Sequence, residues 1–241
     1  MSQTGKTVKI GKRRQFMKGY FVVFLVLVAL FVFMTFANKK FLTYDNLYNL
    51  TRSTAVYGIV ALAMTFVIVT GGIDLSVGTH LGLSGMLLTM LIEEGGWSLA
   101  PAIIAAIVVC GVVGLINGIL IHNGKLPPFI ATLGIKTIIR AVILLISNGR
   151  NISIHNDAFK KFSALTIGFP GTDAYGNATT IGVPVMALVW IILIVISFLI
   201  FRYTTFGRNI FACGSNVNAA RLSGISVRKT IYGAYIVSGL F

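Results

Sequence analysis

The feature that most constrains this chain is a short polar break between two apolar runs, Thr-Gly-Gly-Ile-Asp-Leu-Ser-Val-Gly at residues 70–78. The adjacent Gly71 and Gly72 interrupt a helix, because glycine loses more conformational freedom on folding than any other residue. Asp74 at the centre of a bilayer would cost about 2.5–3.5 kcal/mol. An irregular backbone is tolerated at membrane depth only against protein or a water-filled cavity. The break therefore indicates a membrane protein with a polar path through it.

Composition supports the membrane class independently of this motif. The chain is 56% hydrophobic and only 11% charged, whereas soluble domains carry about 25% charged residues. The net charge of +14 is compatible with nucleic-acid binding. However, most of the basic residues lie in short segments between apolar runs, where Lys and Arg set membrane orientation. We therefore expect no nucleic-acid partner.

The apolar runs predict an all-α, polytopic membrane protein. The run at residues 20–37 has the length of about 20 residues that a span requires. We prefer a retained span to a cleaved signal peptide, because no small-x-small cleavage site follows it. Further spans are predicted at residues 54–70, 78–92, 99–121, 129–147 and 184–201. Residues 231–241 would rise only about 16 Å as a helix, which predicts about six complete helices and a truncated seventh.

The distribution of Lys and Arg predicts the orientation and the division of the chain. With the N-terminus inside, the inside segments carry about twice as many Lys and Arg as the outside segments, as the positive-inside rule requires. We expect a basic cytoplasmic N-terminus at residues 1–19 and a transmembrane domain over 20–241 that is incomplete at its C-terminus. Within that domain, residues 202–230 are predicted to form a cytoplasmic loop, and the hydrophilic stretch 148–183 to lie outside.

Three motifs occur in a fixed order from about residue 45 to the end of the chain. They are the break at 71–78; Pro-Phe-Ile-Ala-Thr-Leu-Gly at 128–134 with Arg140 and Asn148-Gly149 beyond it; and Gly-Arg-Asn-Ile at 207–210, continued through Asn216, 219–225 and Tyr235 to 238–240. In composition, order and separation these segments resemble the ribose-type (carbohydrate uptake class 2) permease subunits of bacterial ABC sugar importers.

The resemblance implies a permease subunit of the bacterial plasma membrane that imports a pentose or hexose by alternating access. It implies four kinds of contact: a second permease subunit, two cytoplasmic ATPase subunits, an extracytoplasmic sugar-binding protein and membrane lipid. ATP hydrolysis is expected on the ATPase partner, because the chain has no phosphate-binding loop. No cofactor, metal site or catalytic residue is expected.

The predicted translocation path and helix break comprise Gly71, Gly72, Asp74, Ser76, Gly78 and Arg140. Asp74 is also a candidate N-cap for a helix beginning at Leu75, accepting from the N–H of Ser76 or Val77. Arg140 lies inside a span, where a cation either serves function or extends to the interface. His80 is either an interior polar group with partners or a proton relay.

Two further sets of residues are predicted to make contacts between elements. The first is a small-residue face that packs against a neighbouring helix, formed by Gly111, Gly114, Asn117 and Gly118. The second is the ATPase contact that the resemblance implies, formed by Asn216, Ala219, Ala220, Arg221 and Gly224. In the second set Asn216 is expected to cap a short helix, and Gly224 to take the left-handed position after it. The alternative is that the arginines of this loop only hold topology.

Three alternatives to a sugar ABC permease stay open. An ion-coupled secondary transporter would use Asp74 and His80 as coupling sites, and such proteins often have discontinuous helices near the midplane. It would have no need of an ATPase contact in residues 202–230. An inactive fragment would insert without transporting. A permease of the same fold for amino acids, a signalling furanose or another small solute would share all three motifs.

Overall fold

The structure, a computed structural model, describes residues 4–150, 154–172 and 178–241. Its long helices are α1 (Thr4–Ala37), α2 (Tyr44–Val69), α4 (Leu99–His122), α5 (Pro128–Ser147) and α7 (Val185–Tyr203). The shorter helices are α3 (Val77–Thr89), the π-helical turn η1 (Met90–Glu94), α6 (Asp157–Ser163), α8 (Thr205–Ser215), α9 (Val217–Leu222) and α10 (Val227–Leu240). The strands β1 (Thr166–Thr172) and β2 (Ala178–Pro184) form one antiparallel hairpin.

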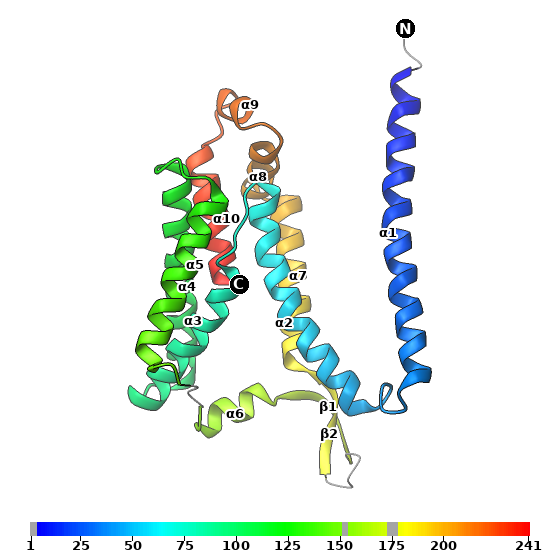
Figure 1. The fold of residues 1–241 in the computed structure, drawn as a ribbon, viewed down its shortest axis with the longest axis vertical. Helices are drawn as coiled ribbons and strands as arrows, with labels where there is room; N and C mark the ends of the chain where they lie inside the picture. The colour runs from blue at the N-terminus through cyan, green and yellow to red at the C-terminus, as the bar shows by residue number, and fades with distance from the viewer. Residues whose placement is uncertain (1–3, 151–153, 173–177) are drawn as a thin grey trace.

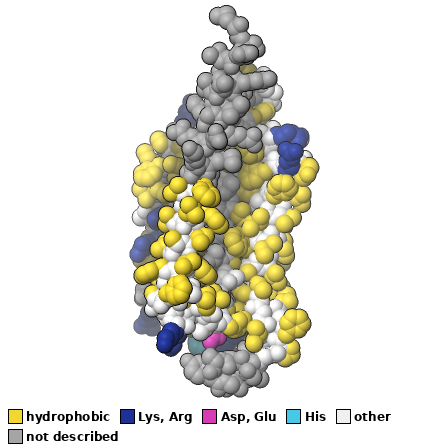
Figure 2. Space-filling model, turned by 90° about the vertical axis from the view of Figure 1, so that its right-hand side faces the viewer, with side chains coloured by type: hydrophobic (Ala, Val, Ile, Leu, Met, Phe, Trp, Pro, Cys, Tyr) yellow, Lys and Arg dark blue, Asp and Glu magenta, His cyan; other side chains and the backbone are white. Residues whose placement is uncertain are grey.

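Within the described residues, α2, α4, α5 and α7 are long and apolar enough to cross a membrane, and Phe21–Ala37 of α1 is a shorter apolar segment. Hydrophobic side chains are spread over the described part of the face in Figure 2, between other side chains and backbone. An outward apolar surface of this kind suits lipid, which cannot satisfy polar groups. The polytopic α-helical class predicted from the sequence is confirmed, and the number of complete spans stays a prediction.

The helices α2, α3, α4, α5, α7 and α10 form a bundle, and α1 stands apart from it (Figure 1). Within the bundle α10 packs most extensively against α4. Small residues make this contact close: a Cβ at Gly114 would overlap the carbonyl oxygen of Tyr235, and one at Gly239 would overlap that of Cys110. Glycine lets helix backbones approach in this way, so α4 and α10 behave as one packed unit.

The predicted inside and outside segments gather at opposite ends of the molecule. The start of α1, the end of α2, the α4–α5 connection and α8–α9 lie at the upper end in Figure 1. The turn η1, helix α6 and the hairpin lie at the lower end. This arrangement agrees with the alternation of sides that the Lys and Arg distribution predicts. That the upper end faces the cytoplasm stays a prediction.

Three predicted spans differ from the helices observed. Helix α1 begins at Thr4 instead of residue 20, so most of the segment predicted as the N-terminus is helical. Helix α2 begins at Tyr44, ten residues before the predicted start, so most of the outside segment 38–53 is helical. The span predicted at 78–92 is a 13-residue α3 followed by η1, and 13 residues of α-helix rise only about 20 Å. Helix α3 is therefore shorter than a complete span, and the break takes the place of the missing helical turns.

The segment 148–183, predicted only as a hydrophilic stretch, contains α6 and the β-hairpin. Two tyrosines at the start of α2 hold the hairpin. The hydroxyl of Tyr44 accepts from the N–H of Gly182 at 2.9 Å, and that of Tyr48 bonds the Thr166 hydroxyl at 2.9 Å. Because Gly and Pro obscure the strand alternation of these residues, the sequence pattern gave no strand signal.

Candidate functional site

The break between α2 and α3 is shaped by its two glycines. Gly71 has a φ of +84°, in the left-handed region that favours glycine. Gly72 lies close to α10: a Cβ at this position would be 2.7 Å from the hydroxyl oxygen of Tyr235. In Figure 1 the chain descends from the upper end of α2 to the start of α3 at about mid-height. The glycines therefore let the chain leave α2 and run close beside α10.

Asp74 is the centre of a fully buried polar cluster. Its Oδ1 accepts from the backbone N–H of Ser76 at 2.9 Å and from the Ser76 hydroxyl at 2.6 Å. Its Oδ2 accepts from the hydroxyl of Ser238 on α10 at 2.9 Å. The Ser76 oxygen in turn accepts from the side-chain amide of Asn117 on α4 at 2.8 Å. The cluster thus joins the break to two neighbouring helices.

The predicted cap at Asp74 is displaced by two residues. Helix α3 begins at Val77 rather than Leu75, and Ser76 occupies the N-cap position. Asp74 still accepts from the N–H of Ser76, one of the two donors predicted for it. The helix starts later because the Asp74 carboxylate turns the chain locally through this bond, as Asx turns do.

Side chains from other helices satisfy the backbone of the break. The Tyr235 hydroxyl donates to the carbonyl of Ile73 at 3.3 Å, and the hydroxyl oxygen of Thr132 on α5 accepts from the N–H of Leu75 at 3.1 Å. Neither Tyr235 nor Ser238 is predicted from the sequence to contact the break, although their i, i+3 spacing on α10 puts them on one helical face. A break in lipid requires such partners.

Of the other residues predicted for the path and for packing, some are exposed and some lie on the face of α4 that contacts α10. Gly78 and Arg140 are exposed, and Arg140 neither joins the cluster nor lines the pocket beside it. Gly111, Gly114 and Gly118 are on the face of α4 that contacts α10: their Cβ positions would meet Leu240, Tyr235 and Tyr232 respectively. Asn117 lies on this face too, but its amide belongs to the Asp74 cluster.

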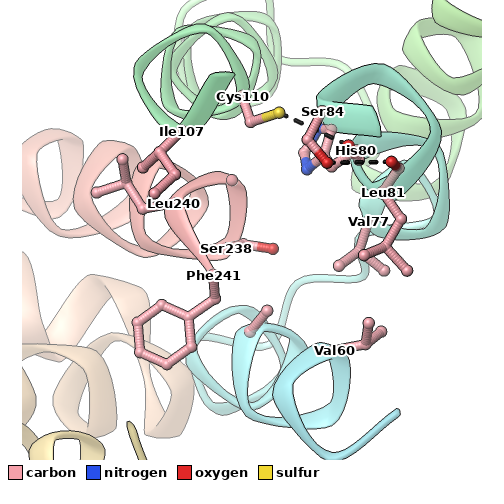
Figure 3. A pocket seen from close by; sticks show the side chains of 12 residues that line it. Val60, Val77, His80, Leu81, Ser84, Ile107, Cys110, Ser238, Leu240 and Phe241 are labelled. Carbon is pink, nitrogen blue, oxygen red and sulfur yellow. Dashed lines mark hydrogen bonds between the residues drawn. The ribbon is translucent and has the colours of Figure 1, made fainter. Parts of the chain in front are cut away.

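A pocket of about 90 Å³ lies beside the cluster, between α2, α3, α4 and α10. Its lining comprises Val60, Ala63, Val77, His80, Leu81, Ser84, Ile107, Cys110, Ser238, Gly239, Leu240 and Phe241. Figure 3 shows His80 on one side of it, with Ser238 pointing in from α10. His80 is 5% exposed, and within the described residues neither ring nitrogen has a hydrogen-bond partner. The hydrogen-bond partners expected for an interior histidine are therefore not found among the described residues.

The predicted coupling segment is helix α9 and its caps. The Asn216 side chain accepts from the N–H of Ala219 at 2.9 Å, and Gly224 has a φ of +80°. The N–H of Gly224 bonds the carbonyl of Arg221, and that of Ile225 bonds the carbonyl of Ala220, both at 3.0 Å. These two bonds define a Schellman cap. The expected N-cap and left-handed glycine are both present.

Helix α9 is anchored on one side and open on the other. Ala220 is buried with Cys213 of α8 and Val227 of α10 in a small apolar core. Arg221 is exposed, and Leu222 is 90% exposed. The helix therefore offers a basic and an apolar side chain at the upper end of the molecule in Figure 1.

A broken helix in a polytopic bundle, with a short capped helix at one end, is the architecture expected of a membrane permease. The family model for the permease component of branched-chain amino acid transport systems matches residues 46–241, and the chain belongs to this family.

Individual relatives are sugar permeases. The ribose import permease protein RbsC of Bacillus subtilis is 38% identical over 217 residues, which are 90% of this chain and 64% of that protein. RbsC of Escherichia coli K12 is 32% identical over 237 residues, 97% of this chain and 71% of that protein. The D-allose transport system permease protein AlsC of Escherichia coli K12 is 33% identical over 222 residues, 92% of this chain and 64% of that protein. The chain thus spans about two thirds of the length of these relatives. No solved structure gives a significant match.

Proposed function

We propose that the chain is a permease subunit of an ATP-driven importer of pentose or hexose sugars. The observation that carries the proposal is the similarity to ribose and allose permeases over 90% or more of the chain. The matched region of the chain includes the polar break that the bundle encloses. In this proposal the subunit lies in a bacterial plasma membrane with its N-terminus and α9 in the cytoplasm. It pairs with a second permease subunit, two ATPase subunits and an extracytoplasmic sugar-binding protein.

The residues predicted for the translocation path divide into two roles in this proposal. Asp74 and Ser76 are fully buried in mutual hydrogen bonds, so they position the break instead of touching solute in this conformation. Gly71 and Gly72 permit the close passage beside α10. Gly71, Gly78 and Arg140 are exposed, and in this proposal they are the members of this set free to meet solute.

The coupling role assigned to α9 follows from its connection to the break. Helix α9 leads through the Schellman cap at Gly224 directly into α10. Tyr235 and Ser238 of α10 then hold Ile73 and Asp74. A displacement of α9 by an ATPase subunit would therefore reach the break through one continuous, well-packed helix. This connection is the means of alternating access that we propose.

An amino-acid permease is the second candidate, because the family's own description names branched-chain amino acids. Reconstitution separates the candidates. The full-length subunit is placed in proteoliposomes with its ATPase and binding-protein partners, and uptake of D-ribose and L-leucine is measured with ATP. We expect ATP-dependent uptake of D-ribose and none with a non-hydrolysable ATP analogue. Uptake of L-leucine alone, or sugar uptake driven by an ion gradient without ATP, would overturn the proposal.

A further inference from the structure

The strongest unexplained feature of the bundle is the imidazole of His80. It is 5% exposed, and neither ring nitrogen has a partner among the described residues. A buried polar group without a hydrogen bond destabilises a protein, and no bulk water is present at membrane depth to relieve it. Both nitrogens belong to a side chain that lines the pocket beside the Asp74 cluster. Both nitrogens are closed off in this conformation, so an occupant of the pocket would supply the missing partners once the imidazole ring turns toward it.

The hydrogen-bonding groups of the pocket define what it accepts. A neutral imidazole offers one donor and one acceptor. The hydroxyl proton of Ser84 is donated to the carbonyl of Leu81 at 3.0 Å, and that of Ser238 to Asp74. Both serine oxygens therefore retain only acceptor capacity toward the pocket. Three acceptors and one donor match a ligand that brings several O–H groups.

The lining also selects against charge. Its twelve residues include no Lys, Arg, Asp or Glu, and the remaining walls are aliphatic or aromatic, including Val60, Leu81 and Phe241. An anion, or the carboxylate of a zwitterion, would lose its hydration here without a countercharge, because the nearest charged group is the Asp74 carboxylate behind Ser238. A neutral polyhydroxylated solute meets both requirements, because its C–H faces pack on apolar walls while its hydroxyls bond the polar groups.

We propose that this pocket binds hydroxyl groups of a neutral sugar, and that His80 is the residue that holds them. The inference rests on the proposed sugar import and adds a contact residue to it. A pocket of about 90 Å³ holds several water molecules, so it receives one hydroxylated edge of the sugar. The site lies next to Ser238 and Asp74, where α10 meets the break.

The ring nitrogens themselves report occupancy. The full-length permease subunit can be labelled with ¹⁵N-histidine and assembled with unlabelled partner subunits, and His80→Phe then assigns the His80 signals. D-ribose and L-leucine are added at equal concentration as probes. We expect the His80 nitrogen shifts to move with D-ribose and not with L-leucine. Nitrogens that exchange with solvent but ignore D-ribose would show that the occupant is water alone, and the inference would be wrong.

Uptake by variants gives an independent readout. His80→Phe fills the space without nitrogens and is expected to lower ATP-dependent D-ribose uptake about tenfold or more, equivalent to about 1.4 kcal/mol. His80→Gln keeps a donor and an acceptor and is expected to retain most uptake. His155→Ala is the matched control, because the His155 side chain is exposed outside the bundle. If His80 only filled space, His80→Phe would keep wild-type uptake.

The outcomes separate this inference from the proposed function. If the wild-type complex imports no sugar, the proposed function fails. If it imports D-ribose, while His80→Phe imports at the wild-type rate and the His80 signals ignore D-ribose, the inference fails and the proposed function stands.

Discussion

At the scale of single residues, the most informative side chain is Asp74. From the sequence it was a candidate for lining a path or capping a helix. In the structure its carboxylate accepts three hydrogen bonds, from the Ser76 N–H, the Ser76 hydroxyl and the Ser238 hydroxyl. A buried carboxylate is stable only with such partners. The residue therefore fixes the position of the break relative to α10.

Removal of the Asp74 carboxylate is expected to destabilise the protein. Asp74→Ala leaves three buried donors without an acceptor, at about 1–3 kcal/mol each. Asp74→Asn keeps one carbonyl oxygen and is expected to be less harmful. Thermal unfolding of the detergent-purified protein measures both, with the exposed Asp45→Ala as control. Equal melting temperatures for Asp74→Ala and Asp45→Ala would refute the structural role of the cluster.

At the scale of elements, α4 and α10 are the pair of helices with the most extensive contact. Their contact depends on glycines at which any side chain would meet backbone atoms of the partner helix, above all Gly114 and Gly239. Small residues on α4 were visible in the sequence. The identity of the partner helix was not, because it lies more than 100 residues away in the chain.

Gly114→Ala is expected to separate α4 from α10 and lower the melting temperature. The added Cβ would overlap the carbonyl oxygen of Tyr235, and overpacking of this kind costs about 1–3 kcal/mol. Gly134→Ala on α5 is the control, because no atom outside its own stretch of helix lies within 4 Å of its Cβ position and alanine favours a helix. Equal melting temperatures for Gly114→Ala and Gly134→Ala would contradict a close α4–α10 contact at Gly114.

Helix α6 is tied to η1 by a second carboxylate, and this contact is expected to depend on pH. Glu93 accepts from the N–H of Asn156 at 2.9 Å and of His155 at 2.6 Å. These backbone hydrogen bonds hold the pKa of Glu93 below its ordinary value of 4.5. With a lowered folded pKa, the contact stabilises fully above about pH 4.5 and is lost as the pH falls through the folded value.

Hydrogen-exchange protection at Asn156 measures this contact, once corrected for intrinsic exchange rates. Protection is expected to fall below pH 4.5 in the wild type. In Glu93→Gln, which has no titratable group at this position, it is expected to be weak and independent of pH. Glu94→Gln, on the neighbouring residue, is expected to behave as the wild type. A wild-type protection that stays constant from pH 6 to pH 3 would contradict the assignment.

At the scale of the whole molecule, α9 is joined to α10 through the Schellman cap, and α10 is hydrogen-bonded to the break. Gly224→Val tests this connection, because a β-branched residue at a φ of +80° is strained by about 1–3 kcal/mol. We expect normal expression and insertion, with ATP-dependent uptake reduced several-fold. Arg221→Ala removes a charge and keeps the cap geometry. If the segment only sets topology, Arg221→Ala will impair insertion and Gly224→Val will transport normally.

The membrane class, the polar break and the capped α9 can be predicted from the sequence, because each depends on local composition or on residues within one turn of each other. Asn216 and Gly224 needed only their own helix to be recognised. Only the packing of distant segments reveals the Ser238 and Asn117 partners of the Asp74 cluster, the α4–α10 contact and the β-hairpin held by Tyr44. The same holds for His80, whose ring has no hydrogen-bond partner among the described residues. These features join segments far apart in the chain, and hydrophobic periodicity states which face is buried without stating what buries it.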